Sequence, residues 1–154
     1  MNLRTLIPAA TLLAALTLYP VRIWAEDEDA NLNDLPAAVQ KTAHDQVGSN
    51  AIEEVEDTYE DGQHATEVEF SESGKKMAVV IAKDGTLIQK EYRMSPADAP
   101  DVIKKAVSAL YPGGKISHIK QVTRKSGVLF ELSVKTDSGA HRLTLDEAGK
   151  RIGA

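Results

Sequence analysis

The sequence carries one alternating pattern twice, 64 residues apart: HATEVEF at residues 64–70 and VLFELSV at residues 128–134. Every second residue of each stretch is expected to face the same side, which is the period of a strand with one buried face. Val68 and Leu132 stand at matching positions, and Glu67 and Glu131 precede them. The repetition indicates two copies of one unit, each with this strand near its centre.

The same shift aligns residues 36–88 with residues 100–152. It gives 6 identities over 53 positions, among them Pro36 with Pro100 and Gly85 with Gly149, which is too few to decide alone. Apolar residues match under this shift more consistently than identical residues do. These pairs are Val39 with Ile103, Val55 with Ile119, Phe70 with Val134, Val79 with Leu143 and Ile81 with Leu145. We therefore predict repeat 1 over residues 34–94 and repeat 2 over residues 95–154.

Each repeat reads as one helix followed by antiparallel strands, so the predicted fold class is α+β. Residues 35–47 and 99–110 place apolar side chains three and four apart, which is typical of an amphipathic helix. Strands are predicted at residues 52–60, 64–70, 76–81 and 87–94, and again at 116–123, 128–135 and 141–146. A bulge is expected near the start of the first strand, because Ile52 and Val55 cannot otherwise face one side. The last strand of the second copy is expected to be a stub.

The N-terminus reads as a secretory signal peptide over residues 1–25. Arg4 precedes an apolar run shorter than the ~20 residues of a membrane span, and Ala25 ends a small-residue cleavage site. Retention as an uncleaved anchor is the alternative. The following acids, Glu26-Asp27-Glu28-Asp29, repel one another and predict an acidic disordered leader over residues 26–33. These features predict a periplasmic or secreted protein with no membrane span after cleavage.

The composition excludes several classes of site and disfavours nucleic-acid binding. The chain has no cysteine, which excludes disulfides, thiolate metal sites and a lipid-anchored cysteine. Its 18 basic and 23 acidic residues give a net charge of −5, which is unfavourable for binding nucleic acid.

No catalytic or cofactor motif is present. The four histidines, His44, His64, His118 and His141, lack the spacing of a zinc site, and the Ser-Gly dipeptides read as turns rather than as a nucleophile elbow. We therefore predict a protein without enzymatic activity, cofactor or metal.

The order of these elements resembles the PepSY-like, β-lactamase-inhibitor-like domains of exported bacterial proteins. The resemblance covers about residues 33–154 and is carried by a helix with Pro in its first turn, a Gly-rich stop, a strand with Glu-Val-Glu or Glu-Leu-Ser, and a strand ending in Asp-Gly. It implies a tandem arrangement with two helices on one face of a continuous curved antiparallel sheet. It also implies a role in binding or inhibiting another protein.

The opposite, open face of that sheet is the predicted partner-binding surface. It is expected to be acidic in repeat 1 and mixed to basic in repeat 2, with apolar residues between. The candidate residues are Glu54, Glu56, Glu67, Glu69, Ala78, Val80, Val122, Leu129, Lys120 and Arg142. An ordinary solvated face is the alternative. On the binding hypothesis, Leu129→Asp with Val80→Asp leaves folding intact and abolishes partner capture.

A second hypothesis is a periplasmic small-ligand or cation-responsive protein. It would use the acidic cluster Glu54, Glu56, Glu67 and Glu69 of repeat 1. A divalent cation that binds only the folded state would then raise the melting temperature.

Overall fold

The computed structural model describes residues 31–153. The predicted signal peptide and residues 26–30 of the predicted leader lie outside the described residues. The elements are, in order, η1 (Leu32–Asp34), α1 (Ala37–Val47), β1 (Ile52–Glu60), β2 (Gln63–Glu72), β3 (Lys75–Ala82), β4 (Leu87–Met94), η2 (Pro96–Asp98), α2 (Asp101–Leu110), β5 (Lys115–Arg124), β6 (Gly127–Thr136) and β7 (Gly139–Asp146). The predicted α+β class is confirmed.

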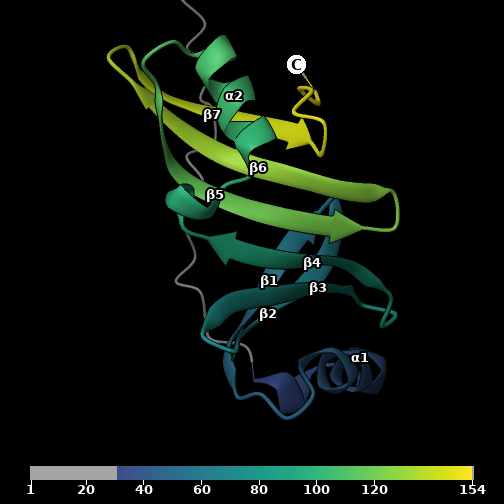
Figure 1. Ribbon diagram of the computed structural model, residues 1–154. Coiled ribbons are helices and arrows are strands. Elements are labelled where there is room, and N and C mark those ends of the chain that lie inside the picture. The colour runs from purple at the N-terminus through teal and green to yellow at the C-terminus, as the bar shows by residue number, and fades with distance from the viewer. Residues whose placement is uncertain (1–30, 154) are drawn as a thin grey trace, which may run out of the picture.

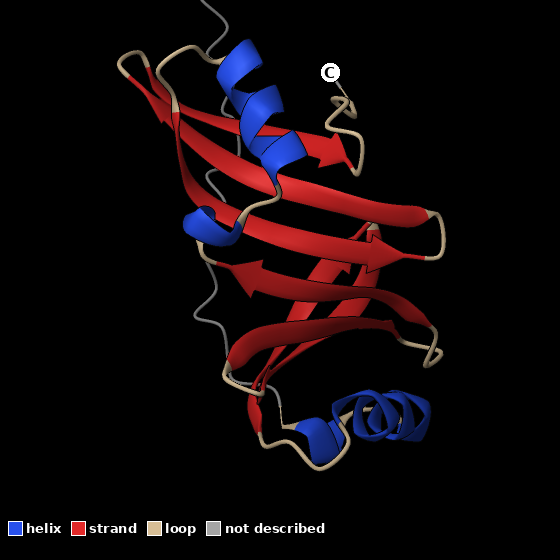
Figure 2. Cartoon of the chain, in the orientation of Figure 1, coloured by secondary structure: helices blue, strands red, loops and turns tan. Residues whose placement is uncertain are grey.

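The seven strands form one antiparallel sheet in sequence order (Figure 1). The two halves of the chain join where β4 pairs with β5, from Gln89 opposite Arg124 to Met94 opposite Ile119. Figure 2 shows the strands as one connected layer, with α1 and α2 near its two ends. The sheet is curved, as expected, and its continuity across the β4–β5 pair makes the two halves neighbours in one layer.

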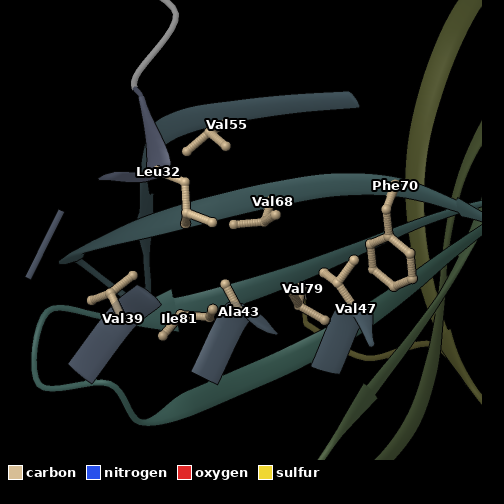
Figure 3. Packing of buried hydrophobic residues seen from close by; sticks show 9 residues of the cluster. All are labelled: Leu32, Val39, Ala43, Val47, Val55, Val68, Phe70, Val79 and Ile81. Atoms are coloured by element: carbon tan, nitrogen blue, oxygen red, sulfur yellow. The ribbon is translucent and has the colours of Figure 1, made fainter. Parts of the chain in front are cut away.

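One face of the sheet holds two separate apolar cores. In the first core, α1 packs Val39, Ala43 and Val47 against the strand residues around Val68 and Val79 (Figure 3). In the second core, α2 packs Ile103 and Val107 against Ile119, Leu132 and Leu143. Val68 is fully buried and Leu132 is 4% exposed, which confirms the predicted inward direction of both. Burial of each such side chain contributes about 1.5–3 kcal/mol to folding.

A tight turn after β3 packs on the helix of its own half, and the end of β7 repeats this arrangement. Gly85 has a φ of +84°, and a Cβ there would lie 2.7 Å from the Ala38 carbonyl oxygen. Gly149 has a φ of +77°, and a Cβ there would lie 3.2 Å from the Val102 carbonyl oxygen. Only glycine combines a left-handed backbone with so close an approach. Each turn therefore docks on the first turn of a helix, at positions that the 64-residue shift relates.

The described part of the predicted leader is ordered, so the boundary at residue 33 is wrong. Asn31 accepts a hydrogen bond from the Asn33 backbone N–H at 3.0 Å and caps the short helix η1. Leu32 is 9% exposed and belongs to the first core. An apolar side chain that completes a core orders its own backbone, and the acidic run 26–29 gave no sign of this contact in the sequence.

Both the predicted bulge and the predicted stub are confirmed. The pairing of β1 with β2 shifts register between Ile52 and Glu54, and β5 shifts in the same way between Ile116 and His118. After Gly149 the chain turns back beside β7 and forms a single bridge from Arg151 to Leu145. Among the described helices, none has the combination of length and apolar character that crossing a membrane requires.

Candidate functional site

The face opposite the helices carries the predicted partner-binding residues. The strand register places Glu56 opposite Glu67, Glu67 opposite Val80, and Val122 opposite Leu129. Residues directly opposite each other in a sheet point to the same side. The sequence therefore grouped these residues correctly on one face.

This face is concave, because the sheet curls toward it. Arg124 near the end of β5 forms ion pairs with Glu60 and Asp61 at the end of β1, the latter at 3.3 Å. In a flat sheet, strands four places apart would be separated by roughly 19 Å. In Figure 1, β1 and β2 accordingly run steeply across the direction of β5 and β6.

The prediction that this face exposes an apolar patch is wrong. Ala78, Val80 and Val122 are only 3%, 2% and 0% exposed, and Leu129 is half-buried. Both helices lie on the other face, so the curled strands themselves cover these side chains. An aspartate at position 80 would place a carboxylate in a dry interior and destabilise the fold. The double variant Leu129→Asp with Val80→Asp is therefore not the fold-neutral test that the sequence predicted.

A buried polar network fills the concave side and was missed by the sequence analysis. Glu91 on β4 is 3% exposed, and its carboxylate accepts hydrogen bonds from Lys120 Nζ at 2.8 and 2.9 Å and from Gln89 Nε2 at 2.7 Å. Gln89 Oε1 in turn accepts from Arg124 Nε at 2.7 Å. Each buried group has a partner, which a stable buried ion pair requires.

The sequence did contain a signal for this network. Gln89, Glu91 and Arg93 alternate along β4, which is the strand that joins the two halves. A polar alternation on a strand normally indicates a solvated face, and only the curl of the sheet makes this one interior. Charged side chains along a central strand are the pattern that could have indicated a buried polar network.

Two further carboxylates adjoin the network from β2. Burial, together with the charges of Glu91 and Glu69, raises the pKa of Glu67 to about 7, although Lys120 and Arg93 act in the opposite direction. Glu69 pairs with Arg93.

Lys120 is the shared cation of the network. Burial lowers the pKa of Lys120, but its hydrogen bonds and attraction to Glu91 and Glu131 outweigh that effect and raise the pKa above the ordinary value of lysine. Lys120 is consequently protonated at neutral pH, and its charge is paired with Glu91 and Glu131.

A groove of about 580 Å³ lies on the concave side of the second half, and we call it the concave groove. Its polar lining comes from β4 to β7. These residues include Arg93, His118, Lys120, Glu131, Ser133 and Arg142. Met94 and Pro96, both half-buried, also line it, so the groove offers polar and some apolar contacts. Ile119, Leu132 and Leu143 border it as well, but their side chains are buried in the second core. Two of the predicted site residues, Lys120 and Arg142, meet there.

The predicted acidic cluster does not form a cation site in the described part of the chain. Glu54 is exposed, and Glu69 is held by Arg93. Between residues 31 and 153, no three His, Asp or Glu side chains are placed to hold a metal ion. The four histidines stay apart, with His64 near Asp57 at 3.6 Å and His141 stacked on Tyr111 at 4.8 Å between ring centroids.

No protein-family model matches the sequence, and no curated protein matches it. Solved structures do share its fold. A candidate periplasmic protein from Bacteroides eggerthii superposes with a TM-score of 0.65 at 13% identity, over 77% of this chain and 86% of that chain. A DUF2874 family protein from Bacteroides uniformis has a TM-score of 0.64 at 15% identity, over the same shares of the two chains.

A BLIP-like protein from Bacteroides fragilis also matches, with a TM-score of 0.61 at 11% identity over 77% of this chain and 84% of that chain. The fold is therefore BLIP-like, as the resemblance implied. At these identities, the likeness defines the fold and leaves the function to be argued from the site.

Proposed function

We propose that this protein is an exported, non-catalytic module that binds another protein through the concave groove. The observation that carries the proposal is the groove itself, about 580 Å³ and lined by charged and polar side chains with Met94 and Pro96 among them. Lys120 lines the groove and is fixed by its hydrogen bonds to Glu91 of the buried network. A rigid, mixed surface of this kind matches a protein interface, where apolar contacts are surrounded by polar ones.

The groove residues are poorly suited to chemistry. The Ser117 hydroxyl donates to the Ser133 carbonyl at 3.1 Å, so a backbone acceptor rather than a general base holds its proton. Lys120 keeps its proton because Glu91 and Glu131 stabilise the charge, so it cannot serve as a base at neutral pH. Binding is the function that these side chains support.

The proposal also includes an exported location and a duplicated structural unit. The signal-like residues 1–25 support a periplasmic or secreted location, and a protein of the same fold from Bacteroides eggerthii is a candidate periplasmic protein. We infer that residues 34–94 and 95–154 are two PepSY-like copies, because the bulges at residues 52–54 and 116–118 and the docked glycines Gly85 and Gly149 recur at the same shift.

Site-specific cross-linking in the exporting cell tests the proposal. A photoreactive amino acid at Ser133 lies in the groove, whereas the same group at Thr123 is exposed on the opposite face, since Thr123 pairs with Lys90 and Val128. We expect a covalent protein adduct from position 133 and none from position 123. Absence of an adduct at 133, or equal adducts at both positions, would contradict the proposal.

A further inference from the structure

We propose that the concave groove recognises an acidic segment of its protein partner, through a basic patch at its outer end. The patch consists of Lys115, His118, Lys135 and Arg142. This inference rests on the proposed function and adds the chemical class of the partner.

The strand register assembles the patch on the concave side. Lys115 lies directly opposite Lys135, His118 lies opposite Ser133, and Ser133 lies opposite Arg142. All four patch side chains are exposed. Like charges placed directly opposite on neighbouring strands destabilise a sheet, so the pair Lys115 and Lys135 weakens the isolated protein. An anionic partner would remove that repulsion.

The patch differs from the three cations that brace the concave face. Arg93, Lys120 and Arg124 each pair with at least one carboxylate and so help to hold the sheet. Within residues 31–153, Lys115, Lys135 and Arg142 form no ion pair. Their charges are therefore available to a ligand, whereas the charges of the paired cations are already neutralised.

The patch is also local to the second half. The 64-residue shift relates Lys115, His118, Lys135 and Arg142 to Ala51, Glu54, Ser71 and Ala78, none of which is basic. The corresponding end of the first half has the exposed Lys76, opposite Ser71, where the second half has three cations. The whole chain carries a net charge of −5. A basic end on an acidic protein orients an incoming anion toward one place, because charges around a concavity focus the field there.

Apolar residues beside the charged ones favour an acidic protein segment over a nucleic acid. Met94 and Pro96, both half-buried, line the groove, so a segment with carboxylates and an apolar side chain can use both parts at once. A polynucleotide would gain from the three charges but would be repelled by the net negative charge of the chain. The geometry thus points to a peptide segment with clustered Asp or Glu next to an apolar residue.

Peptide binding by the full chain tests the inference. The probe is a fluorescein-labelled peptide containing Glu-Asp-Glu-Asp-Leu, and the control peptide contains Gln-Asn-Gln-Asn-Leu. We expect the acidic peptide to bind, to bind more weakly as the salt concentration rises, and to lose about tenfold in affinity in the variant Lys115→Gln, Lys135→Gln, Arg142→Gln. The variant Lys83→Gln, Lys105→Gln, Lys125→Gln removes the same charge from exposed positions elsewhere, and it should bind within about twofold of the parent.

A melting curve accompanies each variant. The patch variant should melt no lower than the parent, since the repulsion between Lys115 and Lys135 is relieved. Equal binding of both peptides, unchanged binding by the patch variant, or equal competition by a single-stranded oligonucleotide would overturn the inference. The cross-link at Ser133 distinguishes failure of this inference from failure of the proposed function. An adduct that persists in the patch variant overturns the acidic-segment inference and leaves the binding function standing. Absence of the adduct from the parent protein overturns the binding function.

Discussion

Glu67 shows how the concave side changes the chemistry of a single residue. It sits on β2, facing Glu91 of β4 and Lys120 of β5, with Glu69 and Arg93 beside it. Burial and two nearby carboxylates disfavour its charged form more than the two cations favour it, so its pKa rises from 4.5 to about 7. The folded protein consequently holds a proton on Glu67 under conditions where the unfolded chain has lost it.

This difference makes stability depend on pH in a defined direction. Between pH 4.5 and about 7 the folded state binds the proton and the unfolded state does not, so the free energy of unfolding falls as the pH rises through that window. Glu67→Gln mimics the protonated form and should melt higher than the parent at pH 8, with a smaller loss between pH 5 and pH 8. Glu54→Gln, exposed on β1, is the control. Thermal melts at both pH values check this, and an unchanged pH dependence in Glu67→Gln would refute it.

At the scale of elements, the decisive contact joins the edge strand β1 to β5, which lies four places away in the sheet. Arg124 belongs to β5, yet it reaches the end of β1 through Glu60 and Asp61 and also holds Gln89 on β4. Three strands thereby meet around one guanidinium. Strand twist brings the β1–β2 hairpin toward β5, and this set of bonds stabilises the curled arrangement that covers Val80 and Val122.

Removing that contact should loosen the first hairpin. Arg124→Met keeps the apolar stem and removes the charge, leaving the half-buried Glu60 and the buried Gln89 short of a partner, which costs about 1–3 kcal/mol of stability. We expect faster amide exchange in β1 and β2, with little change in β6 and β7. Lys41→Met, which breaks an exposed pair with Asp45 in α1, should cost at most about 0.5 kcal/mol. Unchanged exchange in β1 and β2 would show that Arg124 does not hold the curl.

At the scale of the whole molecule, two cores share one sheet. The first core and the second core have no residue in common. They are connected by the six residue pairs of β4 with β5 and by the network around Glu91 and Lys120. Neither half can lose its strands without exposing the polar groups of that junction, so we expect one cooperative unfolding transition.

Matched substitutions in the two cores test this cooperativity. Ile81→Ala in the first core and Ile103→Ala in the second remove fully buried side chains and should each cost about 2–5 kcal/mol. Each variant should show a single transition, with amides of both halves losing protection together. Ile152→Ala, at a side chain 44% exposed, should have little effect. Unfolding of the first half alone in Ile81→Ala would reveal two independent units instead.

Local pattern was enough to predict the elements and their faces. The predicted strands at 52–60 and 87–94 coincide with β1 and β4, and the bulge near Ile52 was predictable because a period of two leaves no other way to bury both Ile52 and Val55. The same parity placed Glu67, Lys120 and Arg142 on one face. Strand alternation is a property of neighbouring residues, so the sequence contains it directly.

Curvature was decided only by the tertiary structure. Alternation assigns a side chain to a face but does not say whether that face is flat and wet or curled and dry. Val80 and Arg142 share the concave face, yet Val80 is 2% exposed and Arg142 is exposed, because the accumulated twist of the strands and the contact of Arg124 with Glu60 close one end of the face and leave the other open. By itself, the sequence determined which residues share the face opposite the helices. The folded sheet decided which of them remain accessible, since contacts between distant strands depend on the whole sheet.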